Sequence, residues 1–301
     1  MFKGFSRAGV ALFVALVALT AGPRPAAAQA ADAAARGAYL FALGGCAGCH
    51  TDSKNKGPLL AGGEPLKTPF GTFYGPNITP DPTYGIGKWS DADFVRALRD
   101  GVGPGGSHFF PVFPYTSFTE MTDDDIKALR AYIFTLPPVA RPSRPHDVGF
   151  PFNLRVLQLF WKMLFFDRGP FRPDASKSPA WNRGAYLSLG VVHCGECHTP
   201  RNLLGGLDRG HWFAGATAAN GPEGNAVPNI TPDPETGIGK WSSDEIATYL
   251  ETGMDPDGDV AGSLMADVIE RSTGKLTSED RAAIVTYLKS VPPIHNEVEE
   301  K

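Results

Sequence analysis

The sequence is poor in cysteine, and all four cysteines fall within two short motifs. Four cysteines in 301 residues are too few for a disulfide-rich scaffold. Basic residues are outnumbered by acidic ones, 28 to 32, which argues against a nucleic-acid-binding protein. Beyond the N-terminal segment there is no apolar run near the roughly 20 residues that a transmembrane helix needs. Glycine and proline are abundant instead, with 35 and 27 residues, and favour short elements joined by ordered loops.

Residues 1–30 have the pattern of an export signal. Lys3 and Arg7 precede an apolar run over residues 9–22, and small residues follow it. We expect cleavage after Ala28 or Ala30. An uncleaved membrane anchor is the alternative, but the apolar run is short for a span, which needs about 20 residues. The sequence therefore predicts an exported protein that is soluble or peripherally attached.

The chain repeats itself in the same order in both halves. RGAYLFALGGCAGCHTD at Arg36–Asp52 returns as RGAYLSLGVVHCGECHTP at Arg183–Pro200. PNITPDPTYGIGKW at 76–89 returns as PNITPDPETGIGKW at 228–241. Such a pattern indicates two tandem copies of one domain. We divide the chain into a signal peptide (1–30), a first repeat (31–139), a linker (140–182) and a second repeat (183–301).

Both repeats predict the same short helices. Ser90 begins a capping-box pattern that precedes an apolar helix face, and Gly101 ends it. Thr122 and Thr277 each begin a last helix that stops before a proline pair. Because no period-two alternation stands out, we predict a mainly α fold. Further helices are expected before each cysteine motif, at residues 32–43 and 181–189.

The linker begins rich in proline (ARPSRPHD) and then turns apolar (FPFNLRVLQLFWKMLFF). Its second part predicts a helix with an apolar stripe that packs between the two repeats. Docking on a partner or on a membrane surface is the alternative. The stripe consists of Leu157, Phe160, Trp161, Leu164 and Phe165, and Met163 is expected to fill the core.

The chemistry lies in two Cys-x-x-Cys-His motifs, Cys46–His50 and Cys194–His198. This spacing is typical of c-type haem attachment. Cys46 and Cys49, and likewise Cys194 and Cys197, lie on one side of a helical turn and can bond to the two vinyl groups of a porphyrin. The histidine that follows can then bind the iron. We therefore predict two covalently bound haem c groups, with His50 and His198 as axial ligands.

Three other uses of the cysteines agree less well with the sequence. A structural zinc site needs four ligands close together, but the pairs belong to different repeats. A thioredoxin-type dithiol needs a strand–helix context that the sequence lacks. Disulfides within each pair leave the two matching histidines unexplained.

The second axial ligand of each iron is expected to be methionine, which raises the reduction potential. The first repeat offers only Met121, immediately before its last helix. The second offers Met254 and Met265, and we favour Met265 because its loop has room to fold over a haem. Since Met121 aligns with a leucine of the second repeat, His108 stays open as the alternative ligand of the first haem.

Other repeated residues are candidates for shaping the haem pockets. Asn77 and Trp89, repeated as Asn229 and Trp241, carry N–H donors that could hold haem propionates. Alternatively, they only fix their loops against the core. The carbonyl of Pro58 is expected to accept a hydrogen bond from His50 and so to orient that ligand.

With these residues in place, the chain resembles the class I cytochrome c fold twice over. It is similar to the cytochrome c subunits of bacterial periplasmic alcohol, gluconate and related dehydrogenases. The two cysteine motifs, both NITPD…GIGKW segments, PYTSFTEMTDDDIKALRAY (114–132) and CGECHTPRNLLGG (194–206) carry the resemblance. It implies Met121 and Met265 as axial ligands. Those subunits often carry three haems and a C-terminal membrane helix, whereas this sequence has two motifs and ends in HNEVEEK.

The resemblance implies a periplasmic dihaem cytochrome c that carries single electrons, as a separate electron-transfer protein or as the electron-transfer subunit of a dehydrogenase complex, and this favours a carrier over an enzyme. Its donor would be a periplasmic dehydrogenase, and its acceptor a cytochrome c or a terminal oxidase of the respiratory chain. The enzymatic alternative is a dihaem oxidoreductase such as a thiosulfate dehydrogenase or a cytochrome c peroxidase. No fifth cysteine is present to act as a thiolate ligand, and methionine candidates in both repeats disfavour an open iron site.

Overall fold

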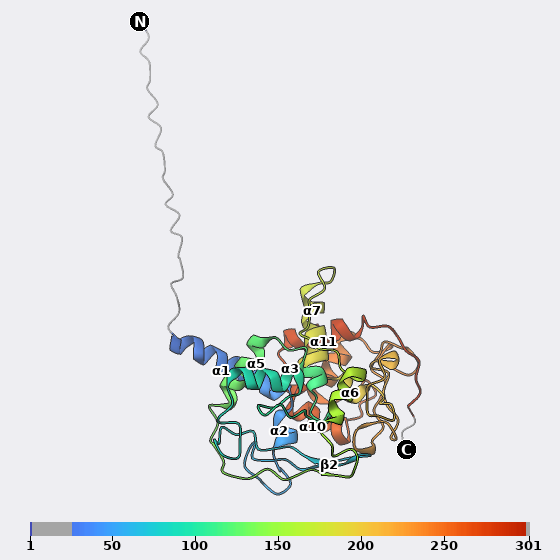
Figure 1. The fold of residues 1–301 in the computed structure, drawn as a ribbon. Helices are drawn as coiled ribbons and strands as arrows, with labels where there is room; N and C mark the ends of the chain where they lie inside the picture. Colours follow the sequence, from blue (N-terminus) through green and yellow to red (C-terminus); the bar gives the residue numbers. More distant parts are fainter. Residues whose placement is uncertain (2–25, 299–301) are drawn as a thin grey trace.

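The computed structural model describes Met1 and residues 26–298. Most of the expected signal peptide, residues 2–25, lies outside the described residues. The described part is mainly helical, as predicted, with short helices and long loops (Figure 1). Its α-helices are α1 Ala26–Leu43, α2 Cys46–His50, α3 Asp91–Asp100, α4 Tyr115–Phe118, α5 Asp123–Ile133, α6 Leu157–Phe165, α7 Pro179–Tyr186, α8 Gly195–His198, α9 Ser243–Thr252, α10 Ser263–Arg271 and α11 Ser278–Leu288.

The predicted helix starts are confirmed by their caps. The Ser90 hydroxyl oxygen accepts a hydrogen bond from the backbone N–H of Asp93, and the Asp93 carboxylate accepts one from the backbone N–H of Ser90, which closes the capping box of α3. Ser242 and Glu245 make the same box on α9. The threonines before α5 and α11 also cap their helices. Both copies of this local sequence therefore fold alike.

In each repeat, the helix before the cysteine motif packs on the last helix: α1 on α5, and α7 on α11. A glycine lies at each contact. A Cβ on Gly37 would come within 1.9 Å of the Ala128 carbonyl oxygen, and one on Gly184 within 1.9 Å of the Ala283 carbonyl oxygen. The repeated sequence Arg-Gly-Ala-Tyr-Leu therefore places its glycine where the two helices approach most closely.

The tyrosine of that repeated sequence joins the two halves. The hydroxyl of Tyr39 donates to Asp280 on α11 (2.8 Å), and the hydroxyl of Tyr186 donates to Asp125 on α5. Each aspartate also pairs with the arginine of its own repeat, Arg36 or Arg183. This reciprocal exchange gives the two repeats a self-complementary interface of the kind that a two-fold axis generates.

The second repeat has one more residue than the first between its arginine and its first cysteine. The helix absorbs this residue in a π-helical turn, η1 Leu187–Val191, which follows α7 directly. The equivalent part of α1 is regular α-helix. Because α7 begins at Pro179, it starts inside the predicted linker, and the predicted domain boundaries stay a prediction.

A small sheet was not foreseen from the sequence. Strands β1 Pro65–Thr68 and β2 Gly71–Tyr74 form an antiparallel hairpin, and β3 Asp147–Val148 pairs antiparallel with β2. The strands are too short for period-two alternation to stand out, which is why the sequence pattern missed them. β3 brings the start of the linker back onto the first repeat.

The linker helix forms as predicted, and its packing agrees only in part. Trp161 of the stripe packs on Tyr115 of the first repeat and donates to the Leu204 carbonyl of the second, whereas other apolar side chains of the helix face outward. The side chains that α6 buries are Gln158 and Lys162, whereas Leu164 is 69% exposed and Met163, expected in the core, is 76% exposed. The Lys162 ammonium donates to the carbonyl oxygens of Asp100 (2.6 Å) and Gly101 (2.9 Å) at the C-terminal end of α3. Positive charge is favoured at a helix C-terminus, so this contact turns the polar side of α6 inward.

Among the described residues, no helix is both long enough and apolar enough to cross a membrane.

Candidate haem sites

The two cysteine motifs have the local structure that was predicted. Each forms a short helical turn, α2 and α8, that begins after a residue in the left-handed conformation. That residue is Gly45 in the first repeat (φ 62°) and His193 in the second (φ 49°). The turn places the two cysteines three residues apart, on one side of a helical segment, with the histidine directly after the second cysteine.

A backbone carbonyl orients each motif histidine. His50 Nδ1 lies 2.7 Å from the Pro76 carbonyl oxygen, and His198 Nδ1 lies 2.8 Å from the Pro228 carbonyl oxygen. Because a carbonyl can only accept, Nδ1 carries the hydrogen and Nε2 keeps its lone pair. The acceptor expected from the sequence, Pro58, was wrong. The correct acceptors, Pro76 and Pro228, are the first residues of the two copies of Pro-Asn-Ile-Thr-Pro-Asp. The repetition of this segment was the sequence feature that could have identified them.

The protonation state of these imidazoles suits metal binding. Burial lowers the pKa of His50 and that of His198, although the carbonyl contacts act in the opposite direction. Both rings are therefore neutral at neutral pH. A neutral imidazole with a free Nε2 and an anchored Nδ1–H is the form in which histidine ligates iron.

The threonine after each motif was missed in the sequence. Thr51 Oγ1 accepts the backbone N–H of Leu60, and Thr199 Oγ1 accepts that of Phe213, each at 3.1 Å. The carbonyls of Leu60 and Phe213 in turn accept the N–H of the isoleucine in the Pro-Asn-Ile segments, each at 2.9 Å. These bonds hold the proline carbonyl against the histidine. The sequence feature that could have indicated this role is that threonine follows Cys-His in both repeats.

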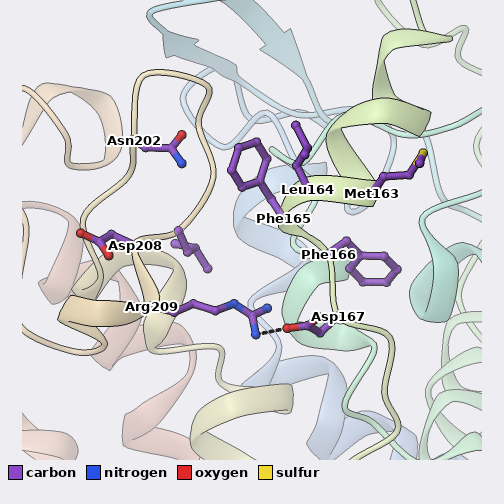
Figure 2. Close-up of a pocket in the computed structure, with 9 residues that line it drawn as sticks. Met163, Leu164, Phe165, Phe166, Asp167, Asn202, Asp208 and Arg209 are labelled. Carbon is purple, nitrogen blue, oxygen red and sulfur yellow. Dashed lines mark hydrogen bonds and ion pairs between the residues drawn. The ribbon is translucent and has the colours of Figure 1, made fainter.

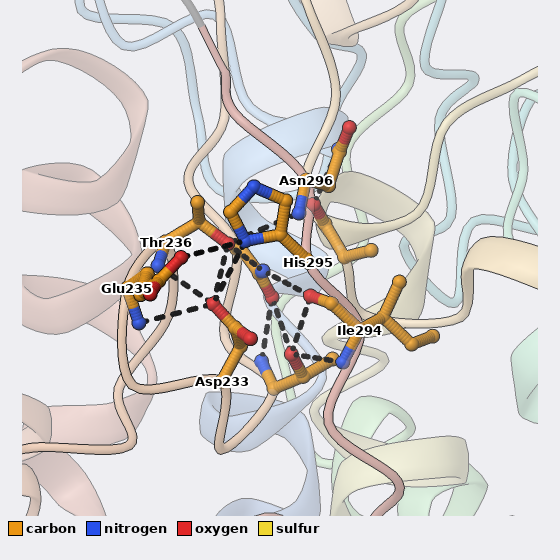
Figure 3. A network of polar contacts seen from close by, with 9 residues as sticks. Asp233, Glu235, Thr236, Ile294, His295 and Asn296 are labelled. Carbon is orange, nitrogen blue, oxygen red and sulfur yellow. Dashed lines mark hydrogen bonds and ion pairs between the residues drawn. The ribbon is translucent and has the colours of Figure 1, made fainter.

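The predicted propionate donors Asn77 and Asn229 are used inside the protein. Asn77 Nδ2 donates to the carbonyls of Val139 and Arg141, both at 2.8 Å. Asn229 Nδ2 donates to the Ile294 carbonyl (2.7 Å) and to Thr236 Oγ1 (3.0 Å), and these two partners are labelled in Figure 3. Both amide hydrogens of each residue are thereby committed. The structure favours the loop-fixing interpretation, in which each asparagine ties its loop to the segment after the last helix.

The two tryptophans differ from the asparagines. Trp89 and Trp241 are half-buried, and within residues 26–298 their indole N–H groups have no hydrogen-bond acceptor. Their carbonyls accept from Arg130 and Lys289, which fixes the backbone but leaves the rings free to donate. Their role toward haem propionates stays a prediction.

Met121 lies in the core of the first repeat, with 1% of its surface exposed, immediately before the Thr122 cap of α5. Met265 is half-buried in the first turn of α10. The sequence predicted a loop around Met265, and this was wrong. Residues Ser263–Arg271 instead form the amphipathic helix α10. The assignment of both methionines as axial ligands stays a prediction.

The alternative ligands have other surroundings. Met254 is 49% exposed. His108 Nδ1 lies 3.1 Å from Lys162 Nζ, so this ring faces the linker helix. These contacts favour Met121 over His108 and Met265 over Met254.

The other interpretations of the cysteines find no support. Neither cysteine pair forms a disulfide in the structure. Burial raises the pKa of Cys46 and that of Cys194 to about 12, which is opposite to the lowered pKa of a reactive thioredoxin-type thiol. Among the described residues, no group of three or more His, Cys, Asp or Glu side chains could hold a bare metal ion.

The two motifs lie close to each other across the interface between the repeats. Ser272 Oγ donates to the carbonyl of Leu43 (2.7 Å), and His193 Nε2 lies 3.4 Å from the carbonyl of Gly44. Gly44 lies two residues before Cys46, and His193 directly precedes Cys194. The residues at each site, paired thiols with an anchored neutral imidazole, fit one covalently attached haem per repeat.

Comparisons with known proteins agree with this fit. A family model for cytochrome c matches residues 34–137. A dihaem cytochrome c-type protein of Cereibacter sphaeroides is 48% identical over 266 residues, which cover 87% of this chain and 86% of the relative. The fructose dehydrogenase cytochrome subunit of Gluconobacter japonicus is 41% identical over 90% of this chain. The cytochrome c subunit of a quinone alcohol dehydrogenase from Komagataeibacter europaeus is 40% identical over 96% of it.

The last two relatives are longer proteins. The matched region covers 54% of the fructose dehydrogenase subunit and 63% of the alcohol dehydrogenase subunit.

Proposed function

The chain belongs to the dihaem c-type cytochromes, and we propose that it carries single electrons from a periplasmic dehydrogenase to the respiratory chain. It holds two haem c groups, attached through Cys46 and Cys49 and through Cys194 and Cys197. Each haem supplies an iron that accepts or donates one electron. We propose Met121 and Met265 as the ligands opposite His50 and His198.

The observation that carries this proposal is the pair of anchored imidazoles. His50 and His198 are each held by a carbonyl and are neutral, and each repeat contains a partly or fully buried methionine that we propose as the ligand on the opposite face. An iron with both axial positions filled has no room for a substrate. Such a site suits electron transfer, and several relatives are named as cytochrome subunits of dehydrogenases. As acceptor we propose a cytochrome c or a terminal oxidase.

A reduction assay tests this function. Periplasmic extract of the native cell is mixed with the oxidised dihaem protein, and ethanol, gluconate or fructose is supplied in turn. We expect one substrate to reduce both haems, followed by reoxidation with a respiratory cytochrome c. The reduced protein should not bind carbon monoxide. Carbon monoxide binding together with peroxide or thiosulfate turnover would instead support the enzymatic alternative.

We propose that the dehydrogenase docks on an exposed apolar face around α6. Large exposed apolar side chains gather there, and contiguous patches of this kind mark interaction sites. Trp161 Nε1 donates to the Leu204 carbonyl (2.8 Å), which joins the linker part of this face to the loop that follows the second haem motif. The face comprises Phe150, Phe152, Leu154, Val156, Leu159, Phe160, Met163, Leu164, Leu203 and Leu204.

The charges beside the apolar face favour a protein over a membrane. A hollow of about 400 Å³ lies between the end of α6 and residues 202–209, and Asp167 and Arg209 form an ion pair in it (Figure 2). Arg168 is likewise paired, with Asp100. An anionic lipid surface is attracted by unpaired basic residues, and the chain as a whole has a net charge of −4. A protein partner can bury the face without breaking an ion pair, and it would lie beside the second haem.

Substituting Phe160 and Met163 by glutamine tests the docking site. We expect the apparent KM of the dehydrogenase for this cytochrome to rise about tenfold, equivalent to about 1.4 kcal/mol of binding, with unchanged haem spectra. Substituting Leu59 and Val260 by glutamine, two exposed apolar residues elsewhere, should leave KM unchanged. If the first variant instead keeps its KM but no longer sediments with phosphatidylglycerol vesicles, the face is a membrane contact and the proposal is wrong.

A further inference from the structure

A buried carboxylate lies inside the second haem motif. The Glu196 side chain is only 7% exposed. Its oxygens accept hydrogen bonds from Arg201 Nη2 (2.6 Å), from Ser117 Oγ (2.8 Å) and from the Thr116 hydroxyl. Burying a charged group is costly unless it is paired and hydrogen-bonded, and here every neighbour named is a donor to the carboxylate.

The partners of Glu196 come from both repeats. Arg201 follows the second motif, but Thr116 and Ser117 belong to the first repeat, on α4. The chain runs from α4 through a single turn to Met121, the proposed axial ligand of the first haem. Glu196 therefore connects the attachment site of one haem with the ligand segment of the other.

Neither member of the ion pair has a counterpart in the first repeat. The position equivalent to Glu196 is Gly48, and the one equivalent to Arg201 is Ser53. Both repeats build the same motif turn, so the fold does not require this pair. The pair is an asymmetry that sets the surroundings of the second haem apart from those of the first.

A fixed charge in a buried site acts on redox groups because little solvent screens it. Oxidised haem iron carries one more positive charge than reduced iron. A nearby carboxylate therefore stabilises the oxidised state and lowers the reduction potential, and a nearby guanidinium raises it. With Glu196 inside the motif and Arg201 farther along the chain and more exposed, the anion is the member held at the haem site.

We propose that the Glu196–Arg201 pair tunes the reduction potential of the second haem relative to the first, and so sets the direction in which electrons pass between them. Glu196 is a positioning and charge-bearing residue, not a ligand. This inference rests on the proposed electron-transfer function, but the potentials can be measured on the isolated dihaem protein without any partner.

Two substitutions with opposite effects test the inference. Glu196→Gln keeps the size of the side chain and leaves Arg201 unpaired, so the potential of the second haem should rise. Arg201→Gln leaves Glu196 unpaired, so that potential should fall. We expect each change to shift the electron equilibrium between the two haems about tenfold, equivalent to about 59 mV, in a spectroelectrochemical titration. Arg201→Lys keeps the charge and should restore most of the native potential.

Matched measurements separate tuning from a loss of structure. Glu251→Gln removes an exposed carboxylate from another ion pair, with Arg281, and should leave both potentials unchanged. If Glu196→Gln loses a haem, Arg201→Gln and Arg201→Lys carry the comparison alone. Shifts of equal sign in Glu196→Gln and Arg201→Gln, no shift in Arg201→Gln, or an equal shift in Arg201→Gln and Arg201→Lys would overturn the inference. If the potentials shift as expected while no dehydrogenase reduces the protein, only the proposed function fails.

Discussion

Replacing Cys194 and Cys197 by alanine leaves a protein with a single haem, on the first repeat. Each haem is held by the two thiols of its own motif, and the two motifs belong to separate helical turns, α2 and α8. Loss of one pair therefore removes one prosthetic group and leaves the other attachment site intact. Mass spectrometry of the denatured protein, made in a host able to attach haem, should show one haem per chain where the native protein shows two.

The matching variant with Cys46 and Cys49 replaced should lose the other haem. Both single-haem proteins should accept one electron per chain, half of the native capacity, in a reductive titration. Electron transfer from the dehydrogenase through the chain to its acceptor should fall by at least tenfold if both haems lie on the route. A native protein that carries one haem or none would contradict the attachment scheme on which the rest depends.

Substituting Met121 by leucine opens the iron of the first haem. Leucine stands at the equivalent position of the second repeat, Leu276, and is buried there, so this part of the fold accommodates its volume. We expect half of the weak sulfur-to-iron absorption band to disappear and carbon monoxide to bind one of the two reduced haems. The potential of that haem should fall by on the order of 100 mV, within the roughly 0.8 V over which axial ligands move haem potentials.

Met265→Leu should have the same effect on the second haem. His108→Ala and Met254→Leu are the controls, because we assign the axial positions to the other residues and both controls should keep the full sulfur band. If Met121→Leu retains the complete band and His108→Ala alters the spectrum of one haem, the ligand of the first haem is His108. The potential of that haem would then be low from the outset, as expected for two histidine ligands.

Much of the helical structure could be predicted because its signals are local. A capping box such as that of Ser90 and Asp93 is completed within one helical turn, and Gly101 ends α3 in the left-handed conformation that glycine favours. The cysteine motifs are equally local. The β1–β2–β3 sheet could not be predicted in this way, since β3 lies far along the chain from the hairpin it joins.

The errors about the site share one cause, which is a partner remote in the sequence. Pro58 is near His50 along the chain, but Pro76 is nearer in space. The donors of Asn77 looked free for a propionate until the structure placed them on the carbonyls of Val139 and Arg141. The apolar stripe of α6 was expected to lie wholly in the core, but Lys162 is the side chain buried there, because its ammonium donates to the carbonyl oxygens of Asp100 and Gly101.

Residue order alone was enough to identify two Cys-x-x-Cys-His motifs, the capped starts of several helices and the duplication. Each of these depends on residues close together in the chain or on plain identity between the two copies. How the two repeats pack against each other was decided only by the tertiary structure. The reciprocal contacts of Tyr39 with Asp280 and of Tyr186 with Asp125, and the reach of Glu196 to Ser117, join residues from opposite halves. Such contacts require both halves to be folded and docked, and no local pattern in a single chain encodes which surfaces will meet.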